Sequence, residues 1–182
     1  DLSDSQTFTL SVTPVNDAPV IDTVLDQEMN EDTILEVALF GSDIDVGDEL
    51  SFDVVDIDNA TVSVASNILT IDSVDNHNGT LTVTVSVNDG QESDSTPFDV
   101  LVNEVNDAPE FITESVSEAF EDDLYQQEIE SEDIDDIDSS LTISLIEYPL
   151  WISLDGSILS GIPTQNDIGI TNITLSVSDG EL

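Results

Sequence analysis

The chain has 182 residues, of which 42 are acidic and none is lysine, arginine or cysteine, so its formal net charge is −42. This composition excludes disulfides and thiolate metal sites, and it makes nucleic acid and anionic membranes unfavourable partners, because both need cations on the protein. The charge also makes cations part of the chain's working environment, whereas the 38% apolar content, arranged in alternating runs, argues against disorder.

Alternating apolar residues predict a series of short β-strands and no helix of useful length. Residues 5–15 place Phe8, Leu10 and Val12 on one face, which indicates a half-buried strand. The segments that follow with the same character are 20–25, 34–40, 50–55, 61–64, 68–71, 81–87 and 98–105. Seven short strands separated by turn residues predict an immunoglobulin-like β-sandwich.

A second sandwich is predicted after the first, and it lacks a last strand. Its expected strands are 111–116, 124–129, 141–146, 152–154, 158–159 and 173–177. We therefore predict an all-β chain of tandem Greek-key sandwiches in three parts. Residues 1–19 are the final strand and linker of a preceding or neighbouring chain's repeat, residues 20–109 form one sandwich, and residues 110–182 form the incomplete one.

The two sandwiches are related by a repeat of 90 residues. The sequence Val-Asn-Asp-Ala-Pro occurs at 15–19 and again at 105–109. A true repeat carries its pattern at constant offset, and several other features do so. The matching pairs are Phe8 with Phe98, Leu10 with Val100, Val12 with Val102, Asp43 with Asp133, Asp45 with Asp135, and Asp89 with Asp179.

The missing strand of the second sandwich has the pattern of residues 5–15, and two explanations are open. Either the chain is a repeat unit of a longer polymer cut at an arbitrary phase, or separate chains exchange this strand and complete one another's sandwiches. Both explanations imply a head-to-tail filament. No segment is long and apolar enough to span a membrane, so no direct membrane insertion is expected.

Two Asp-x-Asp pairs indicate binding of a hard cation. Asp43 and Asp45 in the first repeat, and Asp133 and Asp135 in the second, follow the second strand of their repeat. In an extended segment, side chains two residues apart point to the same side. Calcium takes six to eight oxygen ligands, so other acidic groups must converge with each pair. The spacing does not fit an EF-hand.

The sequence resembles the cadherin-like repeats of large bacterial secreted adhesins and surface fibres. The Val-Asn-Asp-Ala-Pro junctions, the Asp-x-Asp loops and the closing Asn88-Asp89-Gly90 and Ser178-Asp179-Gly180 carry this resemblance. Residues 148–164 resemble the dystroglycan-type subclass, with Trp-x-x-Leu-Asp-Gly followed by Leu-Ser-Gly-x-Pro-Thr. The resemblance implies that 20–109 is a cadherin-like sandwich and that 110–182 is a dystroglycan-type one.

The resemblance also implies calcium at the junctions between repeats. For the central junction it implies the ligands Glu31, Asn106, Asp107, Asp133, Asp135 and Asp179. For the first junction it implies Asn16, Asp17, Asp43, Asp45 and Asp89, while Glu121 would serve the next one. Val15 and Val105 stand where animal cadherin linkers have further ligands, so we expect about one or two ions per junction.

These observations predict a structural repeat of an extracellular adhesin or filament, made rigid by Ca²⁺ and joined head to tail to neighbouring repeats or copies of itself. Cell-surface glycans or proteins are further candidate partners. The alternative is a carbohydrate-binding module of a surface or polysaccharide-degrading protein, with Trp151 as its stacking platform. We expect instead that Trp151 fills the second core and that His77 lies in a surface turn. No nucleophile motif accompanies His77, and we expect no enzymatic activity.

Overall fold

The computed structural model describes residues 3–135 and 141–181. It contains two compact units, unit 1 (Asp1–Glu104) and unit 2 (Val105–Leu182), and each is described by itself. Within the described residues no helix has the length and apolar character needed to cross a membrane.

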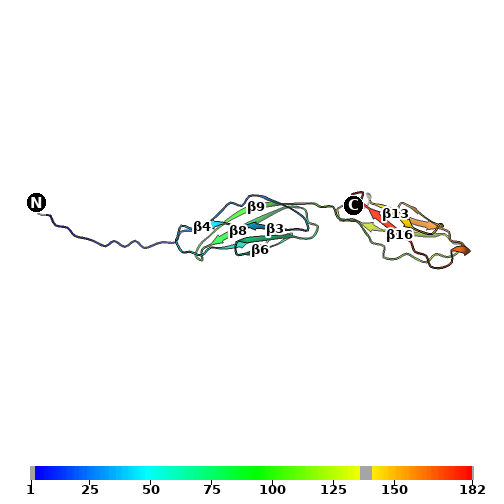
Figure 1. Ribbon diagram of the computed structural model, residues 1–182, viewed down its shortest axis with the longest axis horizontal. Coiled ribbons are helices and arrows are strands. Elements are labelled where there is room, and N and C mark those ends of the chain that lie inside the picture. The colour runs from blue at the N-terminus through cyan, green and yellow to red at the C-terminus, as the bar shows by residue number, and fades with distance from the viewer. Residues whose placement is uncertain (1–2, 136–140, 182) are drawn as a thin grey trace. The chain divides into compact units, whose positions relative to one another are not determined.

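Unit 1 is a sandwich of two antiparallel-rich sheets (Figure 1). Its strands are β1 (Val20–Ile21), β2 (Gln27–Asn30), β3 (Ile34–Ala38), β4 (Gly41–Ser42), β5 (Ser51–Val54), β6 (Ala60–Ala65), β7 (Ile68–Ser73), β8 (Gly79–Asn88) and β9 (Ser93–Asn103). One sheet has the order β2-β9-β8-β5 and the other β3-β7-β6, while β1 pairs with β4. The pairing of β2 with β9 is parallel.

The core of unit 1 follows from the alternation along β8 and β9. Val83, Val85 and Val87 on β8 are fully buried, and their neighbours in the sequence point outward. On β9 the buried residues are Phe98, Val100 and Val102. A strand with one face on the core and one in solvent has this period of two.

Unit 2 repeats most of this architecture 90 positions later. Its strands are β10 (Glu110–Phe111), β11 (Tyr125–Glu128), β12 (Ser131–Glu132), β13 (Thr142–Glu147), β14 (Ile152–Asp155), β15 (Ile158–Gly161) and β16 (Thr174–Ser178), with a 3₁₀ turn at Gln165–Asp167. The pairs β10-β12 and β13-β16 correspond to β1-β4 and β5-β8, and the sheet β11-β15-β14 corresponds to β3-β7-β6. The predicted fold class, tandem immunoglobulin-like β-sandwiches, is confirmed.

Two strands of unit 1 have no counterpart among the described residues of unit 2. These are β9 and β2, and β2 pairs with β9 alone. The counterpart of β2, residues 117–120, forms no strand, and β16 is half the length of β8. The first part of β8, Gly79–Thr84, is paired only with β9. These differences lie around the position that β9 occupies in unit 1.

Residues 5–15 were predicted to be a half-buried strand, and this is not what the structure shows. They pair with no strand and are drawn without an arrow, in blue, in Figure 1. Phe8, Leu10 and Val12 are 81%, 88% and 84% exposed. The alternation fits a strand, but strand structure requires a hydrogen-bonding partner, and the described part of this chain gives the segment none.

Other boundaries also differ from the prediction. The segment 20–25 is a strand only at β1, while β2 was not predicted, because its sequence Gln-Glu-Met-Asn has one apolar residue. Strand β9 begins five residues earlier than expected and includes Pro97. Proline is tolerated there because β2 joins β9 only from Val100 onward, so that Pro97 lies where β9 is an edge strand.

Candidate metal site

In unit 1 the five predicted ligands of the first junction gather at one end of the sandwich. Asn16 and Asp17 precede β1, Asp43 and Asp45 follow β4, and Asp89 lies in the turn after β8. The Asn16 Nδ2 donates to Asp89 Oδ2 at 2.9 Å, and the Asp17 backbone N–H donates to Asp45 Oδ2 at 2.8 Å. The Asp45 N–H in turn donates to Asp43 Oδ1 at 2.7 Å. The linker and both loops are thus held together by side-chain oxygens.

Unit 2 builds the same arrangement from the residues 90 positions later. The Asn106 Nδ2 donates to Asp179 Oδ2 at 2.8 Å, and the Asp107 N–H donates to Asp135 Oδ2 at 2.6 Å. The Asp135 N–H donates to Asp133 Oδ1 at 2.9 Å. The repeat in the sequence therefore corresponds to a repeat of the local hydrogen-bond network.

One carboxylate of the unit 1 cluster was not predicted. Oxygens of Asp43, Asp48 and Asp89 all lie within 4.8 Å of one another. Calcium binds oxygens at about 2.3–2.6 Å, so two ligands of one ion can be up to about 5 Å apart. A signal was available in the sequence, because Asp138 stands 90 positions after Asp48. Asp138 itself lies outside the described residues.

The donor set of unit 1 fits a hard cation by its chemistry and by its burial. The Asp43 Oδ2 atom is buried and has no hydrogen-bond partner within the described structure. Burying a carboxylate oxygen without a partner is unfavourable, and a bound cation would supply the missing interaction. With Asp48 and Asp89, this oxygen gives an all-oxygen set of the kind that calcium prefers.

The cluster shifts the pKa values of two of its carboxyls in opposite directions. Partial burial and the nearby carboxylates of Asp43, Asp45 and Asp89 raise the pKa of Asp48 above its ordinary value of 3.8. Hydrogen bonds from the backbone of Glu92, from the Asn16 side chain and from the backbone of Gln91 lower the pKa of Asp89 below 3.8. The network thus stabilises the charged form of Asp89 and leaves the charge of Asp48 under repulsion. A divalent cation would relieve that repulsion.

The two predicted glutamate ligands lie away from these networks within their own units. Glu31 follows β2 and is 2% exposed, and its backbone N–H donates to the Asn103 carbonyl at 2.9 Å. It lies near the Gly79 end of β8, whereas Asp89 follows the opposite end. Its counterpart Glu121 is exposed. The assignment of both glutamates to calcium at neighbouring junctions stays a prediction.

Comparison with known proteins supports the immunoglobulin-like fold. Residues 16–100 match the family model described as a bacterial Ig domain. Among solved structures, the human desmocollin-1 ectodomain is similar with a TM-score of 0.59 and 15% identity, over 90% of this chain and 38% of that one. Human protocadherin-24 EC1-2 is similar with TM-scores of 0.50 and 0.53 in two crystal forms, at 18% and 17% identity, over 90% and 88% of this chain and 94% and 93% of those.

These comparisons support an immunoglobulin- or cadherin-like fold. The chain spans 38% of the length of the desmocollin ectodomain, and at these identities the likeness concerns the fold alone. No curated protein matches the sequence.

Proposed function

We propose that this chain is a structural repeat of an extracellular adhesin or filament, stiffened by calcium at the ends of its units and joined head to tail to neighbouring repeats. The observation that carries the proposal is the duplicated network. The same linker amides and the same Asp-x-Asp carboxylates are joined by the same hydrogen bonds in both units. Acidic residues that serve only as solvated surface need no such arrangement of hydrogen bonds, so its repetition 90 residues apart supports a binding site.

In this proposal the cation supplies the charge that the sequence lacks. With no lysine or arginine and a net charge of −42, neighbouring repeats repel one another at low ionic strength. The residues Asn16, Asp17, Asp43, Asp45, Asp48 and Asp89 would hold calcium at unit 1. Because Asp17 belongs to the linker and Asp45 to the sandwich, an ion bound to both would fix the direction in which the linker enters the unit.

The carbohydrate-binding alternative depends on Trp151 as a stacking platform. In the structure Trp151 is half-buried and packs against the core of unit 2. Its ring meets Tyr125 edge to face, with the ring centroids 6.0 Å apart and an interplanar angle of 84°. This geometry is typical of packed aromatic side chains and favours the structural role.

The test is thermal unfolding in millimolar calcium, in excess chelator and in magnesium. At ten times its Kd, calcium stabilises a folded unit by about 1.4 kcal/mol, which raises the midpoint of a unit of this size by roughly 6–11 °C. Asp43→Asn should abolish the part of the rise that belongs to unit 1, whereas Asp58→Asn, an exposed acid outside the cluster, should not. Equal midpoints in calcium and chelator would overturn the calcium proposal.

A further inference from the structure

The side-chain amide of Asn16 is held at both of its ends in the candidate metal site of unit 1. Its Nδ2 group donates to Asp89 Oδ2 at 2.9 Å and to the Asp17 carbonyl at 3.1 Å. Its Oδ1 atom accepts a hydrogen bond of 2.6 Å from the Gln91 Nε2 group. The nitrogen of the amide therefore faces the carboxylate of Asp89, and its oxygen faces Gln91.

Gln91 is joined to the same carboxylate through its backbone. Its N–H donates to Asp89 Oδ1 at 2.7 Å, and the N–H of Glu92 donates to the same oxygen, also at 2.7 Å. Hydrogen bonds to a charged acceptor of this kind are strong. Because they use backbone atoms, a substitution of the Gln91 side chain changes the contact with Asn16 and leaves the turn that holds Asp89 in place.

This orientation of the Asn16 amide does not suit a bound cation. An amide NH₂ group only donates hydrogen bonds, so asparagine binds a cation through Oδ1. Asp89 belongs to the carboxylates that lie within 4.8 Å of one another, with Asp43 and Asp48, and the buried Asp43 Oδ2 atom has no hydrogen-bond partner within the described structure. To share an ion with Asp89, the Asn16 side chain has to turn its oxygen to the side where its nitrogen lies.

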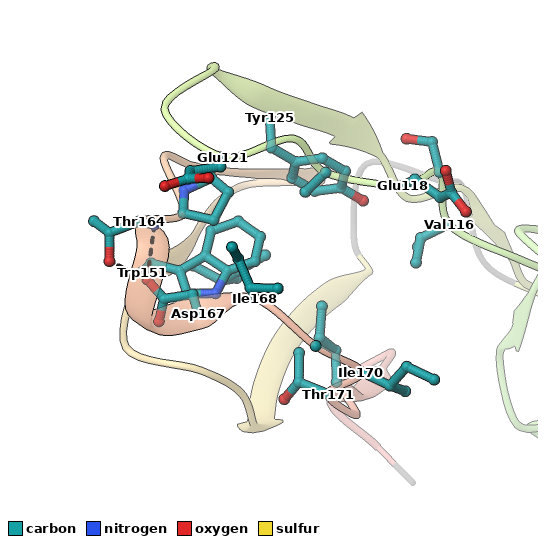
Figure 2. Close-up of a pocket in the computed structure, with 16 residues that line it drawn as sticks. Val116, Glu118, Glu121, Tyr125, Trp151, Thr164, Asp167, Ile168, Ile170 and Thr171 are labelled. Carbon is teal, nitrogen blue, oxygen red and sulfur yellow. Dashed lines mark hydrogen bonds between the residues drawn. The ribbon is translucent and has the colours of Figure 1, made fainter.

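Acidic side chains elsewhere in the chain show that negative charge alone does not create this arrangement. Around a cavity of unit 2, Glu118 and Asp167 lie on opposite sides (Figure 2). The Asp167 Oδ2 atom accepts from the N–H and from the hydroxyl of Thr164, both at 2.8 Å, and so caps a 3₁₀ turn. Among the described residues, three carboxylates come close enough to share one ion only in the cluster of unit 1. The contact between Asn16 and Gln91 is therefore a feature of the site itself.

Unit 2 carries a glutamate at the position of Gln91. Glu181 stands 90 positions later, and its backbone N–H donates to Asp179 Oδ1 at 2.8 Å. The Asn106 Nδ2 group donates to Asp179 Oδ2 at 2.8 Å, as in unit 1. A carboxylate has no hydrogen to donate to Asn106 Oδ1, but it can accept a hydrogen bond from Nδ2. The repeat thus contains both chemistries at this position, a glutamine that holds the amide and a glutamate that does not.

We propose that Gln91 sets the calcium affinity of unit 1 by holding the Asn16 amide with its nitrogen toward Asp89. The inference rests on the calcium site proposed above. When calcium binds, the Asn16 side chain turns about its Cβ–Cγ bond, a torsion with two comparable settings in asparagine, so that Oδ1 faces the ion. The turn breaks the hydrogen bond from Gln91 and brings two N–H donors together. Its loss offsets part of the free energy of calcium binding, and Gln91 is a positioning residue for the site.

The experiment is a calorimetric calcium titration of the 182-residue chain with two different changes at position 91. Every chain, including the parent for comparison, carries Asp133→Asn, which removes a proposed ligand of unit 2, so that the titration follows unit 1. Gln91→Met keeps the length of the side chain and removes the donor. Gln91→Glu combined with Glu92→Gln places an acceptor at position 91 and leaves the net charge unchanged, because the exposed Glu92 loses the charge that position 91 gains.

Both changes should tighten calcium binding. The expected decrease in Kd is about threefold for Gln91→Met and about tenfold for the double variant, which is the range that one hydrogen bond contributes to an equilibrium. The double variant has the larger effect because its carboxylate accepts from the turned Asn16 amide. Glu92→Gln alone is the control, and it should not tighten binding.

Thermal unfolding of the same chains in chelator distinguishes this role from a purely structural one. Loss of the hydrogen bond to Asn16 should lower the midpoint of unit 1 in Gln91→Met by several degrees, although the same change tightens calcium binding. An unchanged midpoint in chelator would contradict the hold on Asn16. Weaker or unchanged calcium binding by either changed chain would overturn the role of Gln91 and leave the calcium site standing, whereas a parent chain that binds no calcium would overturn both proposals.

Discussion

The backbone amides of Asp17 and Asp107 connect the linker to the Asp-x-Asp loops by hydrogen bonds. Each donates its N–H to the second carboxylate of an Asp-x-Asp pair, Asp45 or Asp135. Hydrogen bonds to a charged acceptor are stronger than those between neutral groups. They hold carboxylates of like charge close together in advance, which lowers the cost of ordering the ligands when a cation binds.

Replacing Asp48 by asparagine should stabilise the calcium-free protein and weaken its binding of calcium. The Asp48 carboxylate loses part of its hydration and is repelled by Asp43, Asp45 and Asp89, so Asp48→Asn should raise the unfolding midpoint in chelator. The same change removes a charged ligand and should weaken calcium binding about tenfold or more. Calorimetry of the protein in chelator and of the protein with calcium measures the two effects. Asp58→Asn is the control for a change in net charge alone.

The pH dependence of this difference has a definite direction. Since the folded-state pKa of Asp48 is raised above 3.8, the folded wild type binds a proton more readily than the unfolded chain. The lost hydration and the repulsion therefore destabilise the fold above that raised pKa, and this destabilisation disappears as the pH falls through it. In chelator the advantage of Asp48→Asn should shrink on acidification, and an advantage that grows would contradict the assigned cause.

Gly161 explains part of the motif in residues 148–164. It lies on β15 between β11 and β14, facing Tyr125 and Ile152. A Cβ at this position would lie 1.9 Å from the Trp151 carbonyl oxygen. The backbone of Trp151 thus occupies the space that any other residue would need.

Gly161→Ala should therefore destabilise unit 2 by about 3 kcal/mol, at the upper end of the cost of overpacking, because the clash is with backbone. Urea unfolding followed by Trp151 fluorescence measures this change. Ser176→Ala on strand β16, at an exposed position, is the matched control and should change stability by less than about 0.5 kcal/mol. Equal effects of the two substitutions would contradict the close approach of Trp151 to β15.

At the scale of the element, the strands that could be predicted are those that carry their own signal. Strand β8 alternates over its whole length, and the sequence alone places its core face correctly. Strand β2 carries one apolar residue, Met29, and exists because β9 is beside it. Its partner decides whether such a segment is a strand, and the counterpart 117–120 forms none.

The residues of the candidate site were likewise predicted only in part. The 90-residue spacing predicts which aspartates gather in each unit, because an offset is visible in the sequence. Asp48 was missed although Asp138 repeats it 90 positions later, because it lies outside the Asp-x-Asp pairs, and it is the fold of the loop after β4 that brings it near Asp89. Segment 5–15 was assigned as a strand from its alternation, but alternation describes faces and does not supply a partner.

At the scale of the whole molecule, the two units have unequal cores. In the described residues, twelve buried apolar side chains form the core of unit 1 and four form that of unit 2. Burial of each such side chain contributes about 1.5–3 kcal/mol before the entropy of folding is counted. Unit 2 should therefore be the less stable unit and unfold first in a dilute solution of separate chains.

The unfolding of unit 2 can be followed separately from that of unit 1. The single tryptophan, Trp151, and both tyrosines belong to unit 2, so fluorescence follows unit 2 while circular dichroism follows both units. In urea, the fluorescence transition should therefore come at a lower concentration than the last transition seen by circular dichroism, because the larger core of unit 1 resists unfolding longer. Coincident transitions by the two methods would contradict the unequal stability of the two cores.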